Sequence, residues 1–480
     1  MTRTWFRSRD RSGLSARALL SAALLLACGG DANVTGNRGG AGGAGIGGVG
    51  GTGGDGLTRP PPDAGSGISG VSGDAACATE SVAAQRLGLD LYLMLDSSYS
   101  MLETTASGMD KWDAVKAAIA EFMMAPESAG IGLGLQFFPV VREEIPEDCY
   151  MDDVCGNQGP CLLARTCAPD GPVLLSPAAL RLCDTSAECP MGQTCTPLGG
   201  CSASVEYCTG FGTCGTPDNR CVQIPGYCRE RDRCEPEVYA TPTVAIADLP
   251  GVSSAVLDAL GARRPQGRTP TGPALAGALT LARQRMAANP ERRVAVVLAS
   301  DGFPVACLPN DIQSVAVLAE AAARENPPVS TFAVGVVAPA EAQDSIRNLG
   351  AIAAAGGTGR PYVINTGQDV TAEFLGALAA IRTSALPCEF KIPAPTMGQV
   401  DYTRVNVQYT DPSGQVITLG NVRDRAACDP ALGGWYYDAD PRSGGTPSAI
   451  VACSSTCRTL QGGEGGRVDI VLGCRTVVIE

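Results

Sequence analysis

The sequence has 480 residues, with 36 basic and 49 acidic side chains, a formal net charge of −13, 21 cysteines and no histidine. Without an imidazole the chain cannot form a Ser-His-Asp or Cys-His nucleophile pair, a histidine-based metalloprotease helix or a Cys/His zinc finger. The acidic balance argues against a nucleic-acid partner, and the lack of a Gly-Lys dipeptide excludes the phosphate-binding loop of nucleotide-driven motors.

Residues 1–27 have the order of a secretory signal peptide. Arginines come first, followed by an apolar run from 18 to 27 that is too short to span a bilayer. The run ends Leu25-Leu26-Ala27-Cys28, which resembles a bacterial lipobox; in that family the cysteine becomes the lipidated first residue of the mature protein. We therefore predict cleavage after residue 27 and lipidation of Cys28. An ordinary signal peptide that happens to contain a cysteine is the alternative.

A glycine-rich linker is predicted over residues 28–76. Stretches such as Gly39-Gly40-Ala41-Gly42-Gly43 offer no side chains for a core. As a flexible coil, residues 29–74 have a root-mean-square reach of about 35–40 Å. The linker is therefore expected to hold a globular body away from the membrane surface.

Residues 77–386 are predicted to form an α/β domain. Nearly continuous apolar runs, typical of strands buried on both faces of a parallel sheet, lie at 89–95, 130–140, 294–299 and 330–338. Patterns with helical spacing lie at 112–122, 275–286, 312–318 and 369–383. This alternation predicts a doubly wound, mostly parallel, Rossmann-like sheet with right-handed crossovers.

Oxygen-bearing side chains follow two of the predicted strands. Asp96, Ser98 and Ser100 come after the first run, Thr269 lies in a later loop, and Asp301 follows the run at 294–299. Doubly wound sheets bind ligands beyond the carboxyl ends of their strands, so we expect these side chains to converge. Their oxygens are hard donors that suit Mg²⁺, with Ca²⁺ and Mn²⁺ as alternatives, and do not suit zinc.

At these residues the chain resembles a von Willebrand factor type A (VWA) domain, whose metal-ion-dependent adhesion site (MIDAS) reads DxSxS, then Thr, then Asp. The resemblance extends over 89–141 and again over 239–386. It implies that Ser98, Ser100 and Thr269 bind the cation directly, and that Asp96 and Asp301 do so directly or through water. Because three of these ligands are uncharged hydroxyls, the cation would keep affinity for an Asp or Glu carboxylate of a protein partner.

A cysteine-rich module is predicted to interrupt this domain over residues 145–238. It holds 13 cysteines, and four of them recur 34 residues later, from Cys149 to Cys183 and onward, with a looser third set behind. The chain has no C-x-x-C chelate, so with an export signal these cysteines are predicted to form disulfides rather than zinc sites. Since 13 is odd, one must pair outside the module, with Cys77 or Cys307 as the nearest candidates.

The module follows the second predicted strand, and by the family resemblance it leaves from the end of the sheet that carries Asp96. We therefore predict that it stands beside the metal face and enlarges or selects the ligand surface. A surface decoration without a role in binding is the alternative.

The segment 387–480 is predicted to be a small β-sandwich-like domain. Alternating residues at 402–409 and 415–422 flank a turn, and further β-rich sequence follows residue 467. Trp435-Tyr436-Tyr437 are expected to be core residues, with a binding patch as the alternative.

The predicted function is non-enzymatic. The chain is expected to be an outer-membrane lipoprotein of a bacterial cell envelope, periplasmic or surface-exposed, that captures a carboxylate of a protein ligand through its cation. The alternative is a structural scaffold for envelope assembly that presents the disulfide-rich module without using the metal for binding. Catalysis would need a carboxylate pair or a metal-activated water, and nothing beyond the adhesion-type residues points to either.

Overall fold

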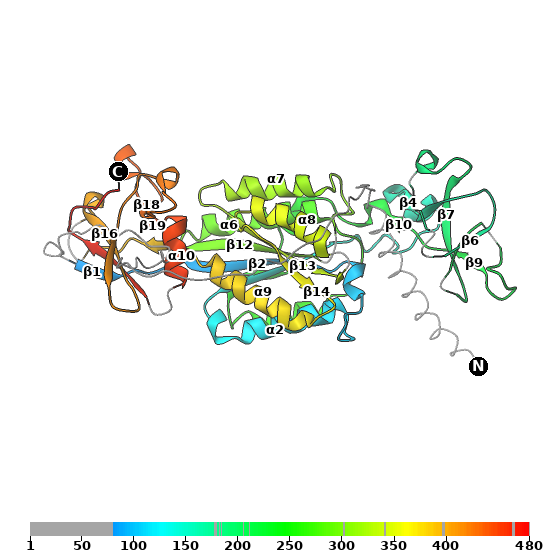
Figure 1. The fold of residues 1–480 in the computed structure, drawn as a ribbon, viewed down its shortest axis with the longest axis horizontal. Helices are drawn as coiled ribbons and strands as arrows, with labels where there is room; N and C mark the ends of the chain where they lie inside the picture. The colour runs from blue at the N-terminus through cyan, green and yellow to red at the C-terminus, as the bar shows by residue number, and fades with distance from the viewer. Residues whose placement is uncertain are drawn as a thin grey trace, which may run out of the picture.

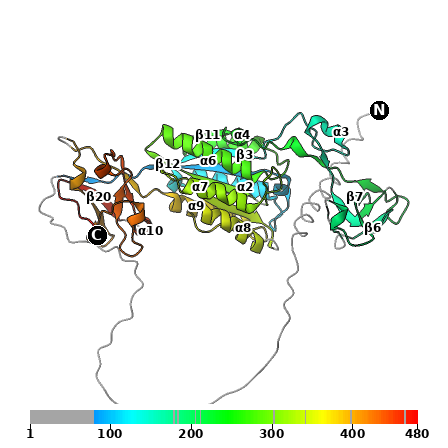
Figure 2. The same ribbon diagram turned by 90° about the horizontal axis from the view of Figure 1, so that it is seen from above.

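The computed structural model describes residues 80–480 except 177–179, 182, 184, 205, 211, 301–302, 340–341, 396–398, 463–465 and 480. The predicted signal peptide, Cys28, the linker and Cys77 lie outside the described residues, and so does Asp301. Three bodies follow one another along the long axis: a C-terminal β-rich body, a central sheet between helices, and the cysteine-rich module (Figure 1). The same order is seen from above (Figure 2).

A six-stranded sheet forms the central body, in the order β11-β3-β2-β12-β13-β14. The strands are β2 (Gly88–Asp96), β3 (Gly132–Phe138), β11 (Val244–Asp248), β12 (Arg292–Ser300), β13 (Ser330–Val337) and β14 (Tyr362–Asn365). Five of them pair in parallel, and β11 joins the edge antiparallel to β3. The carboxyl ends of β2 and β12 consequently lie side by side.

Helices cover both faces of this sheet. One face carries α2 (Lys111–Met124), α5 (Ser253–Ala262) and α9 (Val370–Ala385). The other carries α4 (Pro236–Tyr239), α6 (Thr271–Ala288), α7 (Ile312–Ala323) and α8 (Ala342–Ala355). Along β2, Leu91 and Leu93 enter the first core whereas Tyr92 and Met94 enter the second. Burial on both faces explains why this strand is a continuous apolar run.

The predicted fold class, a doubly wound and mostly parallel sheet, is wrong for this chain. Parallel pairing is confined to five strands of the central sheet, while the other four described sheets, with four, two, three and five strands, are antiparallel. The chain is a mixed α/β protein with many short antiparallel sheets and multiple disulfides. The apolar runs dominated the prediction because short cysteine-bearing strands have no apolar periodicity to reveal them.

Two small sheets share one core in the C-terminal body. One sheet contains β1 (Glu80–Ala83), β20 (Arg467–Leu472), β16 (Val405–Thr410) and β17 (Val416–Leu419); the other contains β15 (Glu389–Lys391), β19 (Ala449–Ala452) and β18 (Trp435–Tyr437). The helix α10 (Ser454–Gly462) lies beside them. Trp435 is fully buried and donates from Nε1 to the Leu419 carbonyl at 3.0 Å, so it is a core residue. The strand β1, predicted to belong to the α/β domain, pairs here with β20 instead.

In its described residues the cysteine-rich module contains α3 (Asp152–Cys155) and seven short strands. They are β4 (Cys161–Leu162), β5 (Arg165–Ala168), β6 (Val173–Leu175), β7 (Thr194–Cys201), β8 (Tyr207–Thr209), β9 (Cys221–Gln223) and β10 (Tyr227–Cys228). Its largest hydrophobic clusters are small, and two of them consist mainly of cysteines. Cross-links rather than a core therefore hold its shape, as predicted.

The disulfides of the module connect three sequence repeats in a closed circle. Each repeat has an internal bridge: Cys149–Cys161, Cys183–Cys195 and Cys208–Cys221. The other bridges join the last cysteine of one repeat to the second cysteine of the next: Cys167–Cys189, Cys201–Cys214 and, closing the circle, Cys228–Cys155. Strand register repeats in the same way, with Cys167 opposite Cys195, Cys201 opposite Cys221 and Cys228 opposite Cys161. The predicted duplication is thus a threefold repeat whose two ends meet.

None of the helices in the described part of the chain combines the length and apolar character needed to cross a bilayer. Nine disulfides join pairs of described cysteines. Disulfides in this number indicate an oxidising compartment, so the protein is extracellular or belongs to the cell envelope.

Candidate functional site

The site is built on the carboxyl end of β2. This strand ends at Asp96, whose side chain is fully buried. The Ser98 amide donates to Asp96 Oδ1 at 2.8 Å, and the hydroxyl of Ser300, the last residue of β12, donates to Oδ2 at 2.6 Å. Because β2 and β12 are neighbouring parallel strands, their ends bring this carboxylate and this hydroxyl together.

Two of the predicted ligands lie directly beyond Asp96. The chain turns in a short 3-10 helix over Tyr99–Leu102, and the Ser98 and Ser100 hydroxyl oxygens lie 3.1 Å apart. Ser98 is buried and Ser100 is half-buried. The structure therefore brings Asp96, Ser98 and Ser100 into one hydrogen-bonded group.

The loop that carries Thr269 lies against this turn. The Gln266 amide donates to the Ser97 carbonyl at 2.8 Å, and the Tyr99 amide donates to the Gly267 carbonyl at 3.2 Å. Thr269 is buried, and its carbonyl accepts from Val305 at 3.2 Å, which joins the loop after β12 to the same place. Asp301, the remaining predicted ligand, follows Ser300 in sequence and lies outside the described residues.

A glycine is required in this loop at position 267. Its φ of +74° lies in the left-handed region, and a Cβ there would be 2.6 Å from Asp232 Oδ1 and 2.7 Å from the Pro139 ring. The Thr269 loop is thus packed tightly between the end of β3 and residue 232 of the cysteine-rich module.

Arg263 supports the turn after β2 through Ser97, although nothing in the sequence pointed to this residue. Its Nε donates to the Ser97 hydroxyl at 2.9 Å, and its guanidinium lies 5.5 Å from the centre of the Phe137 ring and donates to the Pro139 carbonyl. Burial lowers the pKa of Arg263, while the carboxylates of Glu143 and Asp96 act in the opposite direction. Arg263 is the residue that follows α5, and nothing in the sequence marked it. Ser300 was marked, because it ends an apolar run directly before Asp301.

These donors fit a hard divalent cation. The group offers one buried carboxylate and several hydroxyl oxygens, with no imidazole or thiolate nearby, which is the chemistry that Mg²⁺, Ca²⁺ and Mn²⁺ prefer. By contrast, each group of three close cysteines in the described module is engaged in disulfides, so those thiols offer no zinc ligands.

The cysteine-rich module is rooted at the same end of the sheet. Its two ends run antiparallel: the Arg142 amide donates to the Arg231 carbonyl at 2.9 Å, and the Arg233 amide to the Val140 carbonyl at 2.8 Å. Cys234 pairs with Cys307, in the loop after β12, which confirms one of the two predicted external partners. The prediction that the module leaves from the end carrying Asp96 is confirmed as well (Figure 1).

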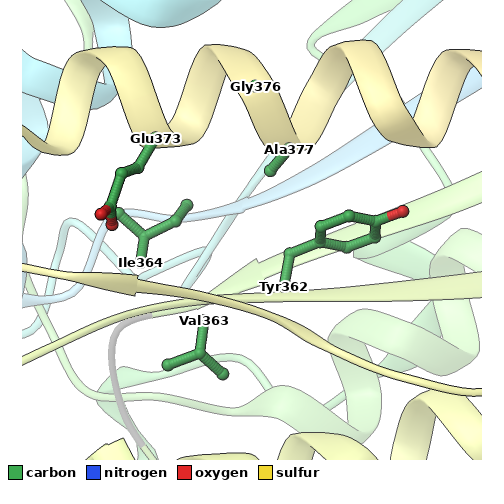
Figure 3. Close-up of a pocket in the computed structure, with 6 residues that line it drawn as sticks. All are labelled: Tyr362, Val363, Ile364, Glu373, Gly376 and Ala377. Atoms are coloured by element: carbon green, nitrogen blue, oxygen red, sulfur yellow. The ribbon is translucent and has the colours of Figure 1, made fainter.

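A shallow hollow lies elsewhere, between the edge strand β14 and α9. It encloses about 260 Å³ and is lined by Tyr362, Val363, Ile364, Glu373, Gly376 and Ala377 (Figure 3). In the sheet, β12 and β13 separate it from β2. The one carboxylate that lines it, on Glu373, accepts a hydrogen bond from the Asn365 amide at 3.0 Å and is therefore already paired with the backbone of β14.

No protein-family model matches the chain, and no curated protein matches it by sequence. Among solved structures, the chain is similar to the pilus adhesin SpaC from Lactobacillus rhamnosus GG (TM-score 0.32, 11% identity, covering 81% of this chain and 39% of that one). It is also similar to the human COPII-coat protein Sec24c (0.27, 8%, 82% and 40%) and to the adhesive tip pilin GBS104 from Group B Streptococcus agalactiae (0.25, 10%, 83% and 82%). The chain spans about two fifths of the length of the first two. At such TM-scores these similarities support no conclusion about fold or function.

Proposed function

We propose that this protein is an extracytoplasmic adhesion or binding protein that captures a carboxylate of a protein ligand through a divalent cation, with Mg²⁺ favoured. The cation would be held by Asp96, Ser98, Ser100, Thr269 and Asp301, in the roles that the resemblance to a MIDAS implies. The observation that supports this most is the buried Asp96 carboxylate with the Ser98 and Ser100 hydroxyls grouped beyond it at the end of β2.

Charge explains why such a site would bind a carboxylate. Mg²⁺ takes six oxygens and commonly keeps several waters when a protein offers few carboxylates. When Ser98, Ser100 and Thr269 are the direct ligands and the Asp96 and Asp301 carboxylates act through water, the hydroxyls leave the positive charge of the ion largely in place. A partner's Asp or Glu can then replace one water. Binding then depends on the metal because the ion itself forms the contact.

The position of the site supports a tethered protein. The described chain begins at β1 in the C-terminal body, and the site lies at the opposite end of the central sheet, beside the module (Figure 1). A linker attached through a lipidated Cys28 would therefore join the end of the molecule remote from the site. The site would then face away from the membrane.

Metal binding is the direct test. Calorimetric titration of the chain from residue 29, with its disulfides intact, should detect a Mg²⁺ site that Asp96→Ala abolishes. Asp469→Ala is the matched control, since Asp469 is also buried but lies on β20 of the C-terminal body. A pulldown from envelope extract with Mg²⁺ or EDTA then tests ligand capture. Equal Mg²⁺ binding by Asp96→Ala and the unsubstituted chain would refute the assignment.

The closed circle of disulfides favours a second candidate, a scaffold that presents the module as a rigid unit. In that case Mg²⁺ would raise the melting temperature without changing which envelope proteins are retained. The same pulldown separates the two functions.

A further inference from the structure

We infer that Asp232, at the root of the cysteine-rich module, is a positioning residue for the cation site, so that the module sets the geometry of the site as well as standing beside it. The inference rests on the proposed function. It concerns two loops, one before Thr269 and one after Ser300.

The first connection is an ion pair between the module and the Thr269 loop. The Asp232 side chain is fully buried, and its Oδ1 accepts from the Tyr227 hydroxyl at 2.5 Å and from the Arg268 amide at 3.3 Å. The Arg268 Nε lies 3.4 Å from Oδ2, and the Arg268 guanidinium also sits 5.0 Å from the centre of the Tyr227 ring. Arg268 immediately precedes Thr269, so Asp232 fixes the backbone and the side chain of the residue next to a proposed ligand.

The second connection is covalent. Cys234, two residues after Asp232, is bonded to Cys307 in the loop that follows β12. That loop also reaches the Thr269 carbonyl through the Val305 amide. Cys307 has a φ of +64°, the only positive value among the described non-glycine residues. Since such a conformation is unfavourable for a residue with a Cβ, the surrounding contacts must hold it in place.

A third connection runs through Arg231 to the turn after β2. Its Nε donates to the Ile145 carbonyl at 3.1 Å, and its Nη2 donates to Gln266 Oε1 at 3.1 Å. The Gln266 amide in turn donates to the Ser97 carbonyl at 2.8 Å. Residues 231–234 therefore contact the loops before Thr269 and after Ser300 directly, and they reach the turn after β2 through Gln266.

Positioning and simple stapling make different predictions about metal affinity. A cross-link that only stabilises the fold changes the free energy of unfolding. A positioning residue also changes the metal affinity, because the ligand atoms of a metal site tolerate displacements of only about 0.5 Å. Removing a supporting hydrogen-bond partner of a metal ligand typically weakens metal binding about 10- to 100-fold.

The test is Mg²⁺ affinity measured by calorimetry on the disulfide-intact chain from residue 29. Asp232→Asn preserves volume but removes the charge opposite Arg268, and we expect Mg²⁺ to bind about tenfold more weakly. Asp218→Asn is the matched control, the same substitution at an exposed position of the module. Circular dichroism and the number of free thiols report whether the fold and the disulfides are intact.

Arg268→Gln provides a second route if Asp232→Asn does not fold, because it removes the same ion pair from the partner side. Where both fold, the double variant should bind Mg²⁺ about as weakly as either single variant, since one interaction has been lost in all three. Additive losses in the double variant would overturn the inference.

The outcomes also separate this inference from the proposed function. If the unsubstituted chain binds Mg²⁺, Asp96→Ala does not, and folded Asp232→Asn or Arg268→Gln binds with unchanged affinity, only the positioning role is overturned. If the unsubstituted chain does not bind Mg²⁺, the proposed function and the positioning role are both overturned.

Discussion

Removing the disulfide between Cys234 and Cys307 should destabilise the central body. The bridge closes 73 residues of chain, among which no other disulfide between described cysteines begins or ends. The loop-entropy relation for a cross-link of that length gives about 4 kcal/mol at 25 °C. With a urea slope of about 3 kcal/mol per molar, the unfolding midpoint should fall by roughly 1 to 1.5 M.

Tryptophan fluorescence can measure the unfolding midpoint of the central body by itself. Trp112 lies on α2 in the central core and Trp435 lies in the C-terminal body. The chain from residue 29 lacks Trp5, so a Trp435→Phe background of that chain leaves only Trp112, which reports on the central body. In that background we compare Cys234→Ser/Cys307→Ser with Cys183→Ser/Cys195→Ser, whose bridge spans 12 residues inside the module. Only the first pair should shift the Trp112 transition. Equal midpoints for the two double variants would refute the view that the Cys234–Cys307 bridge stabilises the central body.

Three further perturbations have distinct expected results. Asp90→Asn should lower the free energy of unfolding by about 3–5 kcal/mol in a urea titration, because the fully buried Asp90 carboxylate is held by Arg285 at 2.8 Å and Arg292 at 2.5 Å. The Mg²⁺ affinity of this variant should be unchanged, because Asp90 lies at the other end of β2 from the proposed cation site. Gly267→Ala should weaken Mg²⁺ binding in the same calorimetric assay, since its Cβ would collide with Asp232 and its φ is positive. Hydrogen bonds lower the pKa of Asp401, Asp411 and Asp429 in the folded protein. The stabilising contribution of these carboxylates is therefore present above the unfolded-state pKa of about 3.9 and is lost as the pH falls through their lower folded-state pKa values. A melting temperature that stays constant between about pH 5 and pH 2 would contradict this.

The sequence predicted the parts of the site that belong to long buried strands. The run at 89–95 became β2, which ends at Asp96. Burial on both faces makes this run apolar except at Asp90, whose buried carboxylate is paired with Arg285 and Arg292. Ser98 and Ser100 followed at the spacing that brings their hydroxyls together. Local pattern and structure agree here because both reflect the same burial.

The remainder depended on contacts between distant segments. Asp232 stands in a run of alternating charges, and nothing in that run distinguishes it from Glu230 and Glu235, which are only half-buried. Its burial arises from Tyr227 and from Arg268 on another loop. The fold class was wrong for a related reason. The short strands of the module are defined by disulfides and by register between cysteines, which leave no apolar alternation to detect.

Closure of the disulfide circle leaves the contacts of the module with the central body concentrated at its two ends, where the antiparallel pair and the Cys234–Cys307 bridge lie. Cys155–Cys228 brings the first and third repeats together, so the chain enters and leaves through the antiparallel pair at 140–142 and 231–233. A force applied to the cross-linked module reaches the central body through that pair and through the Cys234–Cys307 bridge, and residues 231–234 contact loops around the proposed cation site. A ligand that contacted both the module and the ion would therefore displace Thr269 through Arg268. The affinity for the metal and the affinity of the module for that ligand would then be thermodynamically coupled.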